Sequence, residues 1–325
     1  MKLRVSLAVT GGLVLAACSD SSTVGVPNEQ PAFLGVQREI PAHIHVMPTK
    51  AVAAGQGRAR LQRPRSNTGI SYHGGPIIAS TKVASIYWGT GTIYNGGPTP
   101  GSTGSGTQDG SLVGFFLRNL GGSKYFNINS TYYNGSGVHV ANSIAYAGFW
   151  ADNSDPGSSP SDAAIQAEVI KAFTSNKLTF DASTVYLVFT GSGVNLGGGF
   201  GTQYCAYHGH FTWSGNDVKY AAEPYDGQFP GVCTANAGSP NNDAGADAVV
   251  NTVAHETEEA ATDPDLNAWF DTRGYENADK CAWNFGQTYS SANGATANMN
   301  LGGKDFLIQM NWVNAGSGGC LLAYP

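Results

Sequence analysis

The sequence predicts a single α+β domain with a mixed β-sheet, flanking helices and a turn-rich C-terminal part. Short apolar runs typical of buried strands alternate along the chain with segments of helical spacing. Glycine accounts for 44 of 325 residues and charged residues for only 12%, which favours a secreted protein with many turns. A hydrophobic fraction of 41% is enough for a sizeable core.

The expected elements follow one another from residue 69 onward. Strands are expected where apolar runs are bounded by turn residues, at residues 83–88, 185–190, 203–213, 218–225 and 305–312. Helices are expected where apolar residues recur at helical spacing, at residues 111–120, 161–176 and 244–262. Ser161 is a suitable N-cap for the second helix, and Pro264 ends the third.

Residues 1–18 have the pattern of a lipoprotein signal peptide. A basic start and an apolar stretch lead to Leu15-Ala16-Ala17-Cys18, which is similar to the lipobox of bacterial lipoproteins. The resemblance implies that Cys18 carries acyl chains and becomes the first residue after cleavage. We therefore expect an exported protein anchored to a bacterial membrane through Cys18, in the periplasm or at the cell surface.

Residues 19–68 are expected to be a disordered tether or a pro-segment, followed by one domain over residues 69–325. The segment contains scattered prolines and six basic but only three acidic residues. Its C-terminal arginines indicate either a solvated linker or a removable segment: Arg58, Arg60, Arg63 and Arg65. His43 and His45 could bind a metal ion, but two histidines in a flexible segment are a weak indication.

The overall charge excludes one class of partner. The formal net charge is −6, whereas nucleic-acid-binding domains usually present a basic face, so we expect no nucleic-acid partner. No apolar run reaches the roughly 18 residues needed to cross a bilayer. The oligomeric state stays open.

The cysteines fit export. If Cys18 is lipidated, four cysteines remain, and an oxidising compartment favours two disulfides. Four cysteines allow three pairings. We expect near neighbours to pair, as Cys205–Cys233 and Cys281–Cys320, with the second bond closing the turn-rich tail.

The predicted helix over residues 244–262 carries the strongest chemical signal. His255 and Glu259 are four residues apart and therefore share a helix face, and Glu256 follows His255 directly. The pattern is similar to the His-Glu-x-x-His helix of zinc hydrolases, with glutamate in place of the second histidine. It predicts His255 and Glu259 as metal ligands and Glu256 as the catalytic general base.

A third ligand is needed, and several residues compete for that role. Glu276 lies beyond a turn, at a spacing like that of the downstream glutamate in some zinc peptidases. Asp263, His208 and His210 are the alternatives, and His208 is also a candidate catalytic stabiliser of an oxyanion. Zinc is the expected ion, although carboxylate ligands also suit Mn²⁺ or Ca²⁺.

A solvated acidic helix face is the simpler interpretation of the same pattern. Three observations oppose it. Acidic residues are sparse elsewhere in the domain, residues 246–253 are mostly apolar, and carboxylates near a helix C-terminus oppose the helix dipole unless a cation is present.

The predicted domain resembles the EXORDIUM or phosphate-induced protein family, secreted proteins associated with plant cell walls, with bacterial relatives. The resemblance rests on the order of short motifs rather than on any one of them. They are Tyr72-His73-Gly74-Gly75-Pro76, Tyr87-Trp88-Gly89, Cys205 with His208, Pro240-Asn241, Thr262-Asp263-Pro264, Glu276-Asn277-Ala278-Asp279-Lys280-Cys281 and Cys320. The family has no settled enzymatic activity, so the resemblance supports fold and export more than catalysis.

Two functions from different classes follow. The first is a lipid-anchored, metal-dependent hydrolase, peptidase-like, in which Glu256 acts on the attacking water. The second is a non-catalytic EXORDIUM-like protein that binds a cell-surface polymer.

Overall fold

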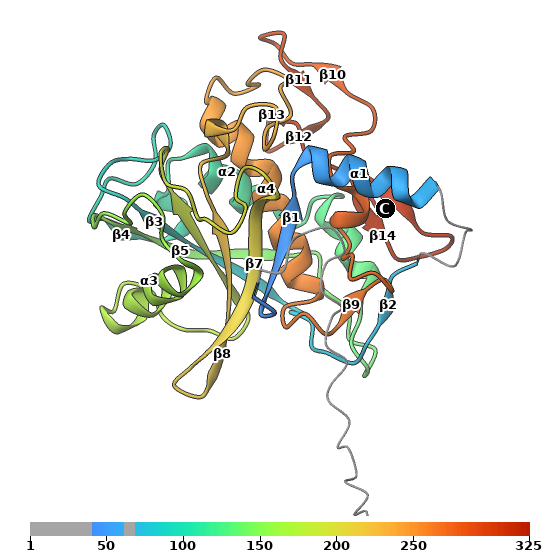
Figure 1. Cartoon of the computed structure of the whole chain (residues 1–325), viewed down its shortest axis with the longest axis horizontal. Coiled ribbons are helices and arrows are strands. Elements are labelled where there is room, and N and C mark those ends of the chain that lie inside the picture. The colour runs from blue at the N-terminus through green and yellow to red at the C-terminus, as the bar shows by residue number, and fades with distance from the viewer. Residues whose placement is uncertain (1–40, 62–68) are drawn as a thin grey trace, which may run out of the picture.

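A computed structural model describes residues 41–61 and 69–325, as a sheet with helices on both faces and a ribbon-rich C-terminal part (Figure 1). The expected signal peptide, the lipidation site Cys18 and the arginines at 63 and 65 lie outside the described residues. In the described part of the chain, we find no helix that is both long enough and apolar enough to cross a membrane.

The central sheet has seven strands in the order β1-β7-β8-β6-β3-β5-β4. Its four inner strands are parallel, and the outer strands β1, β7 and β4 join antiparallel. The bounds are β1 Ile44–Pro48, β3 Thr81–Trp88, β4 Thr103–Gly104, β5 Ile144–Asp152, β6 Thr184–Thr190, β7 Tyr204–Trp213 and β8 Asn216–Glu223. The predicted α+β class with a mixed sheet is confirmed.

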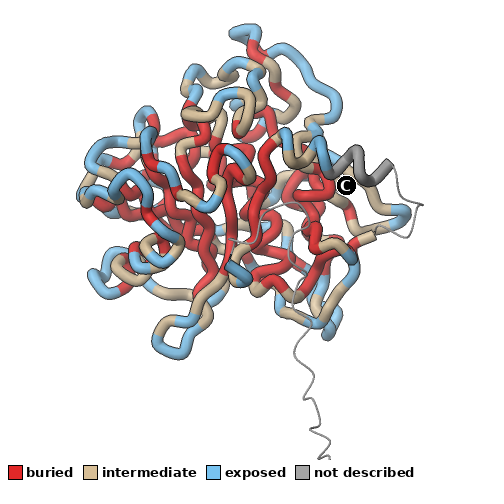
Figure 2. The backbone as a smooth tube through the Cα atoms, in the orientation of Figure 1, coloured by how far each residue is buried: buried red, intermediate tan, exposed pale blue. Residues whose placement is uncertain are grey.

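Helices cover both faces of the sheet. Helices α2 (Leu112–Leu120) and α4 (Ala244–Thr262) pack on one face, and α3 (Asp162–Thr174) packs on the other. A hydrophobic core lies on each face of the sheet, and successive side chains of β3 point to opposite faces. Val83 and Tyr87 therefore pack in the core under α2 and α4, while Ile86 packs in the core under α3. Figure 2 shows the resulting buried interior beneath exposed loops.

The three predicted helices begin within one residue of their predicted starts, at Leu112, Asp162 and Ala244. Ser111 and Ser161 accept hydrogen bonds from the backbone N–H groups of Gly114 and Ala164, and Asp243 caps α4 in the same way. The predicted range of α4 agrees with the structure at both ends.

Four two-stranded ribbons complete the molecule. The pairs are β2 Ser71–Tyr72 with β9 Trp269–Phe270, β10 Tyr289–Ser290 with β11 Thr296–Ala297, β12 Met299–Leu301 with β13 Lys304–Phe306, and β14 Asn311–Val313 with β15 Gly319–Leu321. The predicted continuous strand at residues 305–312 is therefore wrong. The chain between β13 and β14 bonds to the side chains of Asn251 and Asn298 instead of a neighbouring strand.

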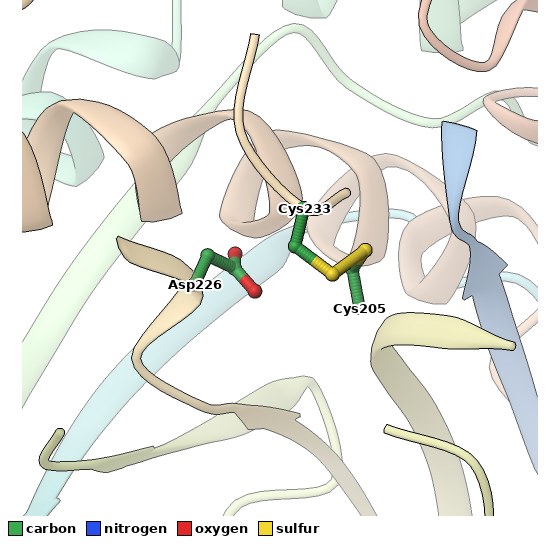
Figure 3. A group of neighbouring side chains, drawn as sticks. All are labelled: Cys205, Asp226 and Cys233. Atoms are coloured by element: carbon green, nitrogen blue, oxygen red, sulfur yellow. A yellow bond between two sulfur atoms is a disulfide. The ribbon is translucent and has the colours of Figure 1, made fainter. Parts of the chain in front are cut away.

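Both predicted disulfides, Cys205–Cys233 and Cys281–Cys320, are present. The first ties β7 to the loop before α4 (Figure 3). The second ties the short 3₁₀ helix η4 (Asp279–Cys281) to β15, and so closes the C-terminal part.

The expected disorder of residues 19–68 is wrong for residues 44–61, which are folded, whereas removal as a pro-segment stays a prediction. Residues 44–48 form the edge strand β1, and α1 (Lys50–Leu61) follows. Val46 and Met47 are almost fully buried, so the folded domain begins well before residue 69. Strand β5 was also not predicted, because glycine and alanine interrupt its apolar pattern.

Candidate functional site

Seven ionisable side chains meet in the interior where α4 packs against β1 and β7. They are His255, Glu256 and Glu259 from α4, His208 from β7, His45 from β1, and Glu276 and Asp279 from the segment leading into η4. Five of them are fully buried, and His45 and Asp279 are each only 5% exposed. A buried group of this size needs a compensating interaction, because each isolated charge is costly away from water.

Sheet register and helix periodicity bring these residues together. His45 lies directly opposite His208 in the β1–β7 pair, and the centroids of their rings are 5.8 Å apart. His255 and Glu259 are one turn apart on the α4 face that packs on these strands. The fold therefore gathers residues that are more than 200 positions apart in the chain.

Glu259 lies at the centre of the group. Its carboxylate oxygens are 3.2 Å from His255 Nε2, 3.7 Å from His208 Nε2 and 4.0 Å from His45 Nε2. Its Oε1 also accepts a hydrogen bond from the backbone N–H of Asp279 at 2.9 Å. All three histidines of the cluster thus face one carboxylate.

Glu276 and Asp279 close the group on the other side. Glu276 is 3.4 Å from His208 Nε2 and 3.6 Å from His45 Nδ1. Asp279 is hydrogen-bonded to His45 Nε2 at 2.6 Å, and its other oxygen is 3.5 Å from His255 Nε2. A carboxylate bonded to one imidazole nitrogen orients the ring, as is usual for histidines that bind metals.

Several buried donor and acceptor atoms of the cluster have no hydrogen-bond partner among the described residues. These are both ring nitrogens of His208, Nε2 of His255, both oxygens of Glu256, Oε2 of Glu259 and Oδ1 of Asp279. Native interiors rarely leave such atoms unsatisfied. The recurring separations of 3.2–3.7 Å exceed the usual length of a hydrogen bond. They match the roughly 3.3 Å between ligand atoms on a tetrahedral metal with bonds of about 2.0 Å.

Two members of the cluster, His208 and Asp279, are held in the protonation states that bind metals. Burial, reinforced by His45 and His255, holds the pKa of His208 well below its ordinary value, so this imidazole is neutral. Burial acts to raise the pKa of Asp279, but His45 and His255 outweigh it and lower the pKa to about 2. Neutral imidazoles and ionised carboxylates bind metals. Burial acts to lower the pKa of His255, but Glu259 and Asp279 outweigh it and raise the pKa well above its ordinary value, while burial raises the pKa of Glu259. Metal binding would therefore release protons from these two groups.

Gln309 sets the tautomer of His255. Its Nε2 lies 3.0 Å from His255 Nδ1 and donates to the carbonyl of Ala278. With the amide nitrogen facing Nδ1, the proton of a neutral His255 lies on Nε2, which faces Glu259. Metal binding through Nε2 requires the Gln309 amide to turn its oxygen toward a protonated Nδ1.

Glu256 and Glu258 have different surroundings despite being close in sequence. One carboxylate oxygen of Glu256 lies within 4.8 Å of the ligand atoms of His208 and Glu259, so the predicted base borders the same group. Glu258 instead accepts a hydrogen bond from Asn311 at 2.7 Å.

Two of the competing ligand candidates lie elsewhere. Asp263 is the C-cap residue of α4, where its backbone N–H donates to the carbonyl of Glu259. Its side chain accepts hydrogen bonds from the backbone N–H groups of Asn267 and Ala268 in the loop that follows. His210 contacts Asp217 at 3.0 Å, in a separate, half-buried acidic group. Of the alternatives to Glu276, only His208 therefore joins the cluster.

A second group of neighbouring side chains, Cys205, Asp226 and Cys233, cannot bind a metal ion through its cysteines. Cys205 and Cys233 lie near Asp226, but their sulfur atoms are joined in a disulfide and cannot act as thiolates (Figure 3).

Sequence reasoning undervalued His45 and missed Asp279. His45 was assigned to a flexible segment, although the apolar run after it is typical of a strand. Asp279 stands three residues after Glu276, in the Glu-x-x-Asp-Lys-Cys motif on which the family resemblance partly rests. That motif was the available signal for a second carboxylate.

A family model and two curated proteins that match this chain all indicate the same family. Residues 121–312 match the family model described as the phosphate-induced protein 1 conserved region. The chain is 26% identical to EXORDIUM-like 5 of Arabidopsis thaliana over 287 residues, which cover 75% of each chain. It is 29% identical to EXORDIUM-like 3 of the same plant over 188 residues, 46% of this chain and 53% of that protein. No solved structure matches.

Proposed function

The chain belongs to the phosphate-induced protein 1 family, and we propose that its buried cluster is a divalent metal centre that stabilises an exported, non-catalytic surface-binding protein. The observation that carries the proposal is the set of unsatisfied buried donor atoms around Glu259, spaced as metal ligands are spaced. A cation would satisfy these atoms and compensate the carboxylates together.

The donor set fits a first-row divalent metal. Glu259 is the shared ligand, and imidazoles from His45, His208 and His255 surround it. Imidazole nitrogen suits zinc, while the additional carboxylates of Glu276 and Asp279 suit manganese. Zinc remains the ion expected from the helix pattern.

A structural role is favoured because the cluster is closed. Structural metal sites are enclosed by protein ligands, whereas catalytic sites keep a position open to water and substrate. The side chains of Glu259, Glu276 and His208 are fully buried. Two surface cavities of the described chain, beside Trp88 and beside Lys304, have other linings.

The proposal is tested by metal content and thermal unfolding of the folded chain. We expect about one equivalent of zinc or manganese, and a melting temperature that falls on chelation and recovers when the metal returns. A His139→Ala variant is the control, because this exposed histidine lies outside every group of the described residues that could hold a metal ion. Unchanged metal content in His208→Ala would contradict the assignment.

Metal-dependent hydrolysis is the second candidate, and the position of Glu256 favours it. Its unsatisfied carboxylate borders the cluster, where a general base would accept a proton. A bound zinc ion would supply Lewis-acid activation of water. On this hypothesis Glu256→Gln keeps the metal and abolishes peptide hydrolysis, with His208 as the oxyanion stabiliser. If the wild-type protein with its metal bound cleaves no peptide library, the structural role stands.

Export and lipid anchoring form a separate part of the proposal. The lipobox-like sequence ending at Cys18 supports them, and the two disulfides suit an oxidising compartment. In a bacterial host, we expect the protein to incorporate labelled palmitate and to partition into detergent. A Cys18→Ser variant should do neither, and labelling of that variant would exclude lipidation at Cys18.

A further inference from the structure

A surface cavity of about 380 Å³ lies at the carboxyl ends of the parallel strands. Its walls come from the loop after β3 (residues 88–93), the loop after β5 (residues 155–156), the loop after β6 (residues 191–194) and Tyr225 beyond β8. The volume falls within the range of ligand pockets, roughly 300–1,000 Å³.

The topology makes this edge a natural binding position. The chain leaves β3, passes through the edge strand β4 and reaches α2 on one face of the sheet, whereas it leaves β5 for α3 on the opposite face. Adjacent parallel strands whose connections diverge in this way open a crevice at their carboxyl ends. Ligands of open α/β sheets characteristically bind there.

At three glycines of the lining, neither the backbone conformation nor a close contact within the protein requires glycine. Gly89, Gly91 and Gly191 lack the left-handed backbone conformation that favours glycine, and a Cβ atom on each would meet no atom within 4 Å. Gly55, in α1, shares both properties but lies outside the cavity. Because these three lining residues have no side chain, a ligand in the cavity can approach their backbone atoms.

The lining chemistry fits a neutral saccharide. Half-buried Tyr225 supplies most of the aromatic surface, since Trp88 is only 8% exposed. Thr90, Thr92 and Ser192 supply hydroxyl groups, and Asp155 supplies a carboxylate. The indole N–H of Trp88 donates to Ser154 Oγ at 3.0 Å, which fixes the ring. The lining contains no lysine or arginine, which disfavours a phosphate or other anion. Sugar rings present C–H faces to aromatic rings and hydroxyl groups to polar side chains.

We propose that this cavity binds one sugar unit of a neutral polysaccharide. The inference rests on the surface-binding role proposed above and gives that role a site distinct from the metal centre. Because a single ring makes few contacts, the affinity is expected to be weak.

Titration calorimetry of the whole protein with neutral hexasaccharides tests the inference, using oligomers of glucose, mannose, galactose, xylose and N-acetylglucosamine as probes. At least one probe should bind. Gly191→Val should weaken that binding at least tenfold, because it adds a side chain at a lining position where a Cβ atom meets no protein atom within 4 Å. The matched variant Gly55→Val should bind within twofold of wild type.

Two results would overturn the inference: no probe binds the wild-type protein, or Gly191→Val binds as well as wild type. Metal content is measured in the same samples. If the protein contains its metal but binds no sugar, the cavity assignment is wrong and the metal centre is unaffected. If the protein contains no metal but binds sugar, the metal centre is wrong and the cavity assignment is unaffected.

Discussion

Glu259 is the residue around which the candidate centre is arranged, since all three histidines of the cluster face its carboxylate. Helical spacing alone was enough to predict that His255 and Glu259 share a face. It was not enough to predict His45, whose position depends on a strand pairing across more than 160 residues. Local periodicity carries information about one element only, and the other ligands come from different elements.

The first prediction concerns the two neighbouring carboxylates of α4. Glu259→Gln should lower metal affinity more than tenfold, because it removes the negative charge of the carboxylate that all three histidines face. Glu258→Gln is the matched control, since its amide oxygen can still accept the hydrogen bond from Asn311. Competition with a chromogenic chelator measures both affinities. Equal losses in the two variants would indicate a general effect of carboxylate removal on the helix.

At the scale of elements, the helices were predicted more accurately than the strands. Ser111, Ser161 and Asp243 cap helices whose apolar spacing is regular, so local sequence specifies their beginnings. The signals for β1 and β5 are weaker, because β1 is a run of only five residues in a proline-containing segment and glycine and alanine interrupt the pattern of β5. The stability of these strands comes from pairing with β7 and β3, which sequence periodicity does not reveal.

Helix α3 carries a pH-sensitive carboxyl that provides the second prediction. Glu168 is 3% exposed, and burial, with a contribution from Asp152, raises its pKa to about 7. Between pH 4.5 and 7 the unfolded chain therefore releases a proton that the folded chain retains. The contribution of Glu168 to the free energy of unfolding should fall as pH rises through this window, by roughly 2 kcal/mol, which is the full linkage value of about 3.4 kcal/mol reduced for solvent screening.

The variant Glu168→Gln isolates this contribution, because glutamine resembles the protonated acid. We expect wild-type stability near pH 4.5 and a gain of roughly 2 kcal/mol at pH 8, measured by urea denaturation at each pH. A stability difference that does not change with pH would show that Glu168 titrates normally.

The third prediction concerns the disulfide of the C-terminal part. The Cys281→Ala/Cys320→Ala variant should lose about 3 kcal/mol of stability, because the bond closes a loop with a sequence separation of 39 residues. It should also bind metal more weakly, since Cys281 ends η4, the element that carries Asp279. Guanidinium denaturation and chelator competition measure the two effects. Unchanged metal affinity would mean that the disulfide does not position η4.

At the scale of the whole molecule, the cluster joins parts that are distant in the chain. The edge strand β1, the central helix α4 and the segment before η4 each contribute side chains. A metal ion at this junction would hold the sheet edge and the ribbon-rich C-terminal part together. The early strand also shows that the folded unit includes residues that composition alone assigns to a linker.

The fourth prediction compares two shortened chains. A chain beginning at residue 41 keeps β1 and His45, whereas one beginning at residue 69 lacks both. The shorter chain should be several kcal/mol less stable, because it loses the buried side chains of Val46 and Met47. It should also aggregate through the uncovered edge of β7. Equal melting temperatures and solubility would show that β1 adds little to the fold.

The most direct test of the central claim is the metal content of the purified, folded protein by elemental mass spectrometry. The metal-centre assignment predicts about one equivalent of zinc or manganese in the wild-type protein and its loss in the His208→Ala/Glu259→Ala variant. A folded wild-type protein that contains no metal, and that gains no thermal stability from added zinc or manganese, would contradict it.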